Sequence, residues 1–326
     1  MHIIPFQSQH IEPAAALFCA GYRRLRAQVP ALPTRMEDPA VVSQSLDWLI
    51  RQRPMQAAVQ DGRLIGFLGW ILVDEFRNTT RRGAYIPEWG WAVAAGADLP
   101  AVTRALYRAA ACDMVAAGVN VHAITLLADD AAAREAWFWH GFGLTGIDAV
   151  HPLHEPLAIR PPAPGVSLRV ASAADLALLV EIEAEHWQHY AQPPTLMVPS
   201  APDGPAEFAQ FVATPPNTAW LAFKDGILAG YLRLQAVIQG GAAVLNSQET
   251  IGITGAYVRP EYRGLGLAPA LVEAARQYYA GQQDAGGSPA FTCLAVDFES
   301  INPEAAAFWP RYFTPVTFSL IRVPEA

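Results

Sequence analysis

The stretch Thr254–Leu271, TGAYVRPEYRGLGLAPAL, decides how this chain folds. It begins with a β-type run, Gly255–Val258, passes through a glycine-containing loop, and ends in a helical pattern. Glycine lets the backbone approach a ligand without a Cβ clash. The first N–H groups of a helix are unpaired and carry partial positive charge. The stretch therefore predicts an anion site between a strand and a helix, best suited to a diphosphate.

The loop does not match two common phosphate-binding motifs, because it lacks Gly-x-Gly-x-x-Gly and has no Gly-Lys-Ser/Thr. It instead resembles the GNAT superfamily of acyl-CoA-dependent N-acetyltransferases. Their pattern, Arg/Gln-x-x-Gly-x-Gly/Ala between the fourth strand and the third helix, is met by Arg263, Gly266 and Ala268. After the next strand, predicted over Phe291–Val296, Asn302-x-x-Ala305 extends the resemblance.

This resemblance implies that acetyl-CoA is a co-substrate. In the family, the loop amides hold the pyrophosphate, the strand before the loop bonds the pantetheine arm through its main chain, and the Asn often bonds that arm. The cofactor-binding residues that the resemblance implies are Ala256, Tyr257, Val258, Arg263, Gly264, Leu265, Gly266, Leu267, Ala268 and Asn302.

The chain also contains an internal repeat. AVQDGRLIGFLGWI (58–71) resembles AFKDGILAGYLRLQ (222–235), and each copy is typical of a hairpin with an Asp-Gly turn. Long helical patterns follow over 99–117 and 265–280, and each leads to a strand and a short aromatic helix. This order predicts a duplicated unit; the alternative is one large α/β domain with chance similarity.

The proline-rich junction near residue 160 has the composition of a linker. We therefore expect an α/β (α+β) fold with mixed sheets, built from two tandem GNAT-like domains. Residues 1–155 form a degenerate GNAT-like domain, 156–165 a Pro-rich linker, and 166–326 a GNAT domain with the CoA-binding loop. In place of that loop, 94–100 has one glycine and Asp98, which would repel a diphosphate. We expect one CoA per chain.

Amide formation also needs a proton acceptor, because an alkylamine with a pKa of about 10.4 is protonated at pH 7. His186 lies with His189 and Tyr190 on one predicted helix face, Glu249 stands at the start of the fourth strand, and Asp297 and Glu299 follow the fifth. Many family members place a Tyr acid where this chain has Trp309, and Tyr312 is one turn further on. The catalytic candidates are Glu249, His186 and Tyr312; loop charges and packed aromatic residues are the structural alternatives.

The amino-acid composition excludes several classes of binding partner. The net charge of −8 argues against nucleic acid, and three separated cysteines argue against a metal centre. Without a long apolar run or a signal peptide, a cytoplasmic protein with no membrane partner is expected. The predicted function is transfer of an acetyl group from acetyl-CoA to a small-molecule amine. Acetylation of a protein amine and a non-catalytic acyl-CoA-binding regulator are the alternatives, and a monomer and a homodimer both stay open.

Overall fold

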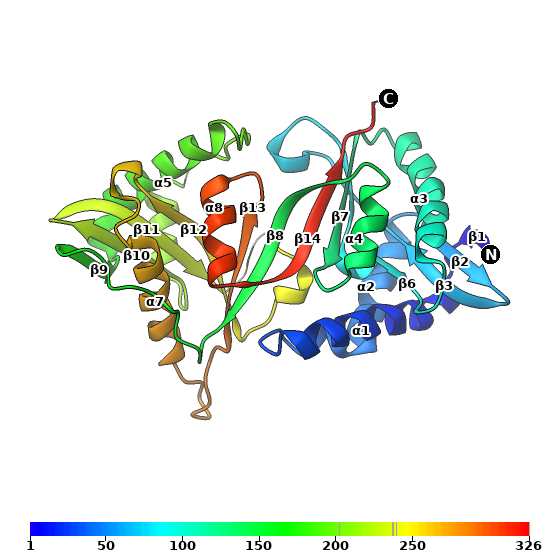
Figure 1. The fold of residues 1–326 in the computed structure, drawn as a ribbon, viewed down its shortest axis with the longest axis horizontal. Coiled ribbons are helices and arrows are strands. Elements are labelled where there is room, and N and C mark those ends of the chain that lie inside the picture. Colours follow the sequence, from blue (N-terminus) through cyan, green and yellow to red (C-terminus); the bar gives the residue numbers. More distant parts are fainter. Residues whose placement is uncertain (202, 237, 239, 326) are drawn as a thin grey trace. The chain divides into compact units, whose positions relative to one another are not determined.

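The computed structural model describes residues 1–201, 203–236, 238 and 240–325. The chain divides into two compact units (Figure 1). Unit 1 comprises Met1–Asp148, Ala242–Val244 and Pro315–Ala326, and unit 2 comprises Ala149–Gly241 and Leu245–Thr314. The compact units differ from the predicted domains at three places, because residues 149–155 belong to unit 2 and residues 242–244 and the C-terminal strand belong to unit 1. In the described part of the chain, no helix has the length and apolar character that crossing a membrane requires.

Unit 1 contains two groups of strands and four α-helices. One group has the order β1-β2-β3-β6 and the other β4-β5-β7-β14. The strands are β1 (His2–Pro5), β2 (Gln56–Gln60), β3 (Arg63–Leu68), β4 (Ile71–Val73), β5 (Gly83–Ile86), β6 (Trp91–Val93), β7 (Val121–Leu127) and β14 (Thr314–Arg322). The helices are α1 (Ile11–Gln28), α2 (Pro39–Gln52), α3 (Leu99–Ala116) and α4 (Ala131–Phe138). The strand β8 (Gly143–Pro152) then leads the chain from unit 1 into unit 2.

Unit 2 contains the strand order β13-β12-β11-β10-β9, antiparallel except for the parallel pair β12–β13. Its strands are β9 (Val166–Val170), β10 (Thr218–Lys224), β11 (Ile227–Gln235), β12 (Thr250–Val258) and β13 (Cys293–Glu299). Its helices are α5 (Leu176–Ala191), α6 (Pro205–Val212), α7 (Leu267–Ala280) and α8 (Pro303–Phe308). A capping box of Ser172 and Asp175 is present just before α5.

The two units repeat the same hairpin in detail. Both turns have positive φ at Asp and Gly: Asp61 (51°), Gly62 (72°), Asp225 (50°) and Gly226 (82°). Both hairpins have a bulge at the same place, after Ala58 in β2 and after Ala222 in β10. Both also set the same residue pair against the next strand, Gly66 with Val93 and Gly230 with Val258. The internal sequence repeat is therefore a repeat of structure.

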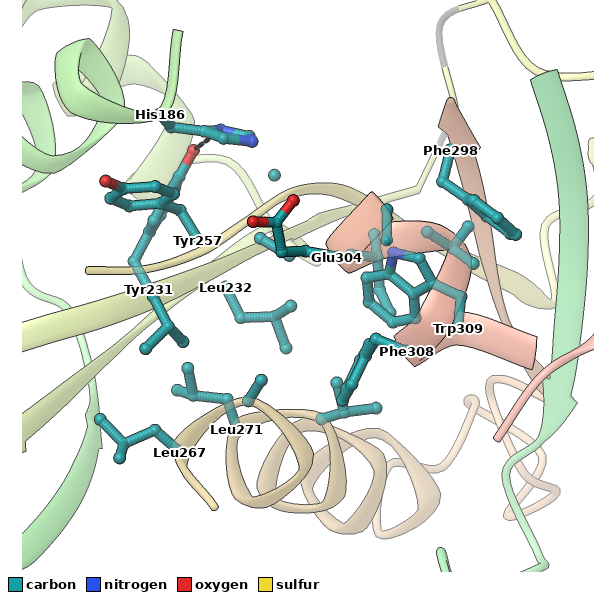
Figure 2. Close-up of a pocket in the computed structure, with 18 of the residues that line it drawn as sticks. His186, Tyr231, Leu232, Tyr257, Leu267, Leu271, Phe298, Glu304, Phe308 and Trp309 are labelled. Atoms are coloured by element: carbon teal, nitrogen blue, oxygen red, sulfur yellow. Dashed lines mark hydrogen bonds between the residues drawn. The ribbon is translucent and has the colours of Figure 1, made fainter. Parts of the chain in front are cut away.

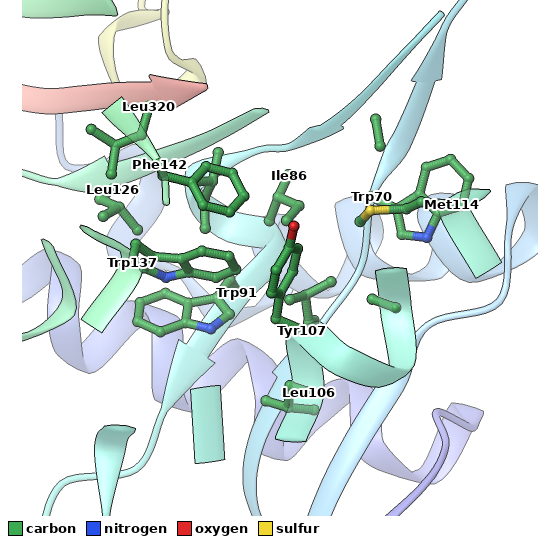
Figure 3. Close-up of a cluster of buried hydrophobic side chains, with 14 of the residues drawn as sticks. Trp70, Ile86, Trp91, Leu106, Tyr107, Met114, Leu126, Trp137, Phe142 and Leu320 are labelled. Carbon is green, nitrogen blue, oxygen red and sulfur yellow. The ribbon is translucent and has the colours of Figure 1, made fainter. Parts of the chain in front are cut away.

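The core of unit 1 is rich in aromatic residues (Figure 3). Trp137 is fully buried, with its ring centroid 5.9 Å from Trp91, 5.3 Å from Tyr107 and 5.0 Å from Phe142. Edge-to-face contacts of this kind add to the stabilisation that comes from burying the rings. These side chains hold α3 and α4 against the strands of unit 1.

Two buried carboxyl groups in unit 1 bind backbone and hydroxyl donors. Glu88 Oε1 accepts from the N–H of Val244 at 3.0 Å. Asp148 accepts from the hydroxyl of Thr317 and from the N–H of Ala242, at 3.3 Å from the latter. Burial raises the pKa of Glu88 to about 7 and that of Asp148 to about 6. They fasten segment 242–244 and β14 within unit 1.

Replacing Trp137 with Ala is expected to lower the free energy of unfolding by about 3–5 kcal/mol, because it leaves a cavity in this core. Trp139 provides a matched control, since it lies two residues away with 83% of its surface exposed. W139A is expected to change stability by less than about 1 kcal/mol. Urea unfolding of both variants checks this; equal losses would contradict the assigned core.

Replacing Glu88 with Gln is expected to change how stability depends on pH. Because the folded-state pKa is about 7 against an ordinary 4.5, the stability contributed by this carboxyl is complete below pH 4.5. It is lost as the pH rises through 7. The Tm of E88Q relative to wild type should therefore be higher at pH 8 than at pH 5.5, by about 2–4 °C or more. Thermal unfolding measures this, with E135Q as the exposed control; a difference that does not vary with pH would rule the effect out.

Candidate active site

A cavity of about 1390 Å³ lies within unit 2. It is lined by residues of β11, β12, β13, α5, α7 and α8, and by residues from the linker. Figure 2 shows His186, Tyr231 and Tyr257 on one side, Phe308 and Trp309 on the other, and the carboxylate of Glu304 between them. The cavity is larger than most drug-sized sites and suits a long ligand.

The cavity exists because β12 and β13 separate. The two strands pair in parallel from Thr250–Cys293 to Ile253–Val296; both continue, but the described ladder goes no further. On its other side β12 stays paired with β11, with a shift of register beside Thr254. One edge of 254–258 therefore presents backbone N–H and C=O groups to the cavity, where a ligand can bond to them.

The glycine loop lies at the N-terminus of α7. Gly264 and Gly266 have φ of 79° and 81°, a left-handed conformation that glycine adopts without strain. Gly266 is the N-cap residue and has no side chain to occupy the first N–H groups. Leu267 and Ala268 therefore keep N–H groups without an intrahelical acceptor, and both residues line the cavity. The partial positive charge of the helix end favours an anion here.

The proline-rich linker packs on this loop. The N–H of Ala163 donates to the carbonyl of Leu265 at 2.9 Å. Pro162 Cα lies 3.1 Å from the position that a Cβ on Gly266 would take, so Gly266 is also needed for this close approach. The linker also brings Arg160 to the cavity lining, which adds a cation to the wall.

Arg263 connects the loop to α8. Its Nε donates to the carbonyl of Val258 at 3.1 Å, and its Nη1 donates to Glu304 Oε1 at 2.7 Å. The other oxygen of Glu304 lies 3.7 Å from Nε2 of His189. An anion bound at the loop would compete with Glu304 for the guanidinium of Arg263.

His186 is buried and hydrogen-bonded. Its Nδ1 lies 2.9 Å from the hydroxyl of Tyr231 (Figure 2). The ring centroids of Tyr190 and Tyr257 lie 4.8 and 5.6 Å from that of His186. Burial and the neighbouring His189 lower the pKa of His186 to about 3. The imidazole is neutral at pH 7 and is too weak a base to remove a proton from an ammonium group.

A second buried ionisable group, Glu183, lies at the same end of the cavity as His186. Glu183 Oε1 accepts from Arg233 Nη1 at 3.0 Å, and the same Nη1 donates to Asp203 Oδ2 at 2.7 Å. Burial raises the pKa of Glu183 to about 7, although the charge of Arg233 opposes this rise. Sequence reasoning missed all three residues. The helical spacing could have indicated Glu183, because it lies one turn before His186 on the same face of the helix.

The structure brings together most of the predicted site residues. All ten predicted cofactor-binding residues line the cavity, as do His186 and Tyr312. Asn302 Oδ1 also caps α8, accepting from the N–H groups of Glu304 and Ala305 at 3.1 and 3.2 Å. The ring of Tyr312 packs against Phe308, with centroids 5.2 Å apart.

Glu249 is not brought to this site. It is exposed just before β12, where its carbonyl accepts from the N–H of Thr292 at 2.8 Å. Five residues of strand, roughly 16 Å, separate it from Thr254, beside which the two strands part. Glu249 thus precedes the paired end of the ladder and is not among the described residues that line the cavity.

Unit 1 carries large or charged side chains at the corresponding positions. Trp91 occupies the place in the repeat that Ala256 has in unit 2, and it packs on Trp137 of α4 (Figure 3). At the start of α3, Asp98 Oδ1 accepts from the N–H of Ala101 at 3.0 Å. A carboxylate thus already occupies the helix end that is open in unit 2.

Comparison with known proteins agrees with this architecture. Residues 180–311 match the model of the acetyltransferase (GNAT) family. The fold of the whole chain is similar to that of a tandem GNAT protein from the clavulanic acid biosynthesis pathway, at 16% identity and a TM-score of 0.50, with 100% of this chain and 99% of that chain covered. It is also similar to a GCN5-related N-acetyltransferase from Sphaerobacter thermophilus, at 13% identity and a TM-score of 0.58, with 100% and 96% covered. No curated protein matches the chain. Residues 180–311 therefore match the GNAT family, and the chain as a whole has the fold of tandem GNAT proteins.

Proposed function

We propose that unit 2 transfers an acetyl group from acetyl-CoA to the amine of a small molecule. The observation that carries this proposal is the slot between β12 and β13, which leads to the glycine loop at the start of α7. A polar backbone edge next to an anion site suits a ligand that has an amide-containing arm and a diphosphate.

In this proposal the loop residues Gly264–Ala268 hold the diphosphate, and the edge of Ala256–Val258 bonds the arm. Arg263 and Arg160 contribute positive charge to the cavity wall. The thioester supplies an electrophilic carbonyl and a thiolate leaving group with a pKa of about 8.5, which needs little help to depart.

His186 acts as a neutral hydrogen-bonding partner with Tyr231, since its lowered pKa makes it unsuitable as the proton acceptor. Tyr312 stays the candidate acid, because its ring lies in the cavity wall and a thiolate can take a proton from a phenol nearby. Removing Tyr312 should affect the rate less than removing the proton acceptor.

The acceptor end of the cavity supports a small molecule over a protein chain. Met197, Ser200, Ala201 and Asp203, which precede α6, line it together with buried residues of α5. Release of CoA with small amines and not with peptides is the result that this proposal requires. Binding of acetyl-CoA without CoA release for any amine would favour the non-catalytic alternative.

Blocking the slot is expected to abolish acetyl-CoA binding. At a ligand concentration 100 times the Kd, binding should raise the free energy of unfolding by about 2.7 kcal/mol, seen as a shift in Tm. A256W copies the side chain that unit 1 has at this position and should eliminate the shift, whereas A256S should keep it. R263E should weaken it strongly by adding a second carboxylate beside Glu304. A full shift in A256W would contradict the proposed position of the arm.

We further propose that unit 1 does not bind the cofactor, because Trp91, Trp137 and Asp98 occupy the corresponding space and helix end. Isothermal titration of the full chain with acetyl-CoA should then give one equivalent. Two equivalents, reduced to one by A256W, would show a second site in unit 1.

A further inference from the structure

We infer that Glu183 binds the ammonium group of the acceptor and accepts its proton, so that the acceptor is a cationic primary amine; this inference rests on the acyl transfer proposed above. Glu183 extends from α5 into the cavity lining, with 5% of its surface exposed. Among the described residues, its Oε2 has no hydrogen-bond partner. A buried carboxylate oxygen without a partner is costly, and a ligand donor would satisfy it.

The charges around Glu183 favour a cation. Arg233 uses one nitrogen, Nη1, for both Glu183 and Asp203. Its guanidinium lies 4.3 Å from the ring centroid of Phe211, which fixes it in this position. When both carboxylates are ionised, this group of three has one excess negative charge. A positively charged ligand neutralises this excess charge, whereas an anionic acceptor would be repelled.

The neighbouring side chains are aromatic. His186 lies one turn after Glu183 on α5, and Tyr231 lies two residues before Arg233 on β11, so both pairs face the same space. The rings of Tyr190 and Tyr257 complete this wall. Aromatic faces attract cations and are a poor environment for anions. The wall therefore supports binding of an ammonium group.

This cluster lies next to the proposed reaction centre. Arg233 is paired with Gly255 in the β11–β12 register, beside Thr254, where β12 leaves β13. An ammonium held by Glu183 is therefore near the open edge of β12. With a pKa of about 7, the Glu183 carboxylate can accept a proton near neutral pH, unlike His186.

The proposed step balances. One proton passes from the ammonium nitrogen to Glu183 Oε2, which leaves an electron pair on the nitrogen. This pair forms the C–N bond to the thioester carbonyl carbon, and the C–S bond breaks with its electrons going to sulfur. The second amine proton ends on the thiol, and Glu183 returns its proton to solvent.

The test compares E183Q with E181Q on the full chain. Gln preserves the shape of the side chain but cannot accept the proton, and Glu181 is a matched control on the exposed side of α5, with 55% of its side chain exposed. For the best primary amine found in a panel, E183Q should lower kcat/KM by about 10²–10⁴-fold at pH 7. E181Q should keep it within about threefold. The acetyl-CoA thermal shift should be unchanged in both variants, which also shows that they are folded.

The pH profile separates a proton acceptor from a structural group. In the wild type, kcat/KM should rise with pH up to about 7, where the carboxyl becomes ionised, and this acidic limb should be lost in E183Q. If E183Q has the kcat/KM of the wild type and keeps the acidic limb, the inference about Glu183 is overturned, and the proposed acyl transfer is not affected. A wild type that binds no acetyl-CoA, or releases no CoA with any amine, would overturn the proposed function itself.

A measurement on the wild type alone tests the charge preference. The trimethylammonium analogue of the best acceptor should inhibit at least tenfold more strongly than its neutral tert-butyl isostere, because only the former satisfies the excess negative charge. Equal inhibition by the two analogues would overturn the cation site, whatever the behaviour of E183Q.

Discussion

The architecture of unit 2 depends on the point at which β12 and β13 stop pairing. A ladder satisfies the backbone groups of both strands, and ending it after Ile253 and Val296 leaves a polar edge inside the protein. The edge is tolerable because it borders a cavity that water or a ligand can enter. The register shift beside Thr254 bends β12 while β11 keeps it in the sheet. The cavity, the glycine loop and α8 take their positions from this separation.

The two units carry different side chains on hairpins of the same backbone structure. Their hairpins share turns, bulges and register, so the difference between them lies in side chains. In unit 1 a tryptophan stands at the place of Ala256 and packs on Trp137, and an aspartate caps the start of α3. Unit 1 has packed aromatic side chains at this place, whereas unit 2 has a cavity that a ligand can enter.

Local signals allowed much of this structure to be predicted. The Asp-Gly turns and the glycine loop each depend on a few adjacent residues. The group of Glu183, Arg233 and Asp203 could not be predicted, because it forms only when α5 packs on β11 and the chain returns before α6. The sequence places Glu249 at the start of the fourth strand, but it does not show where the ladder between β12 and β13 ends. The place of β14 is another long-range pairing that no short motif encodes.

The pairing of β14 affects how the protein folds during its synthesis. β14 pairs with β7 in unit 1, from Thr317 with Leu127 to Arg322 with His122, and the hydroxyls of Thr125 and Ser319 bond across 194 residues of chain. A ribosome releases the N-terminal half first, so β7 leaves the exit tunnel without this neighbour. The pairing of β7 with β14 can form only after β14 has been synthesised. Until then the edge of β7 that pairs with β14 carries unpaired backbone groups, and such an edge can pair with other chains.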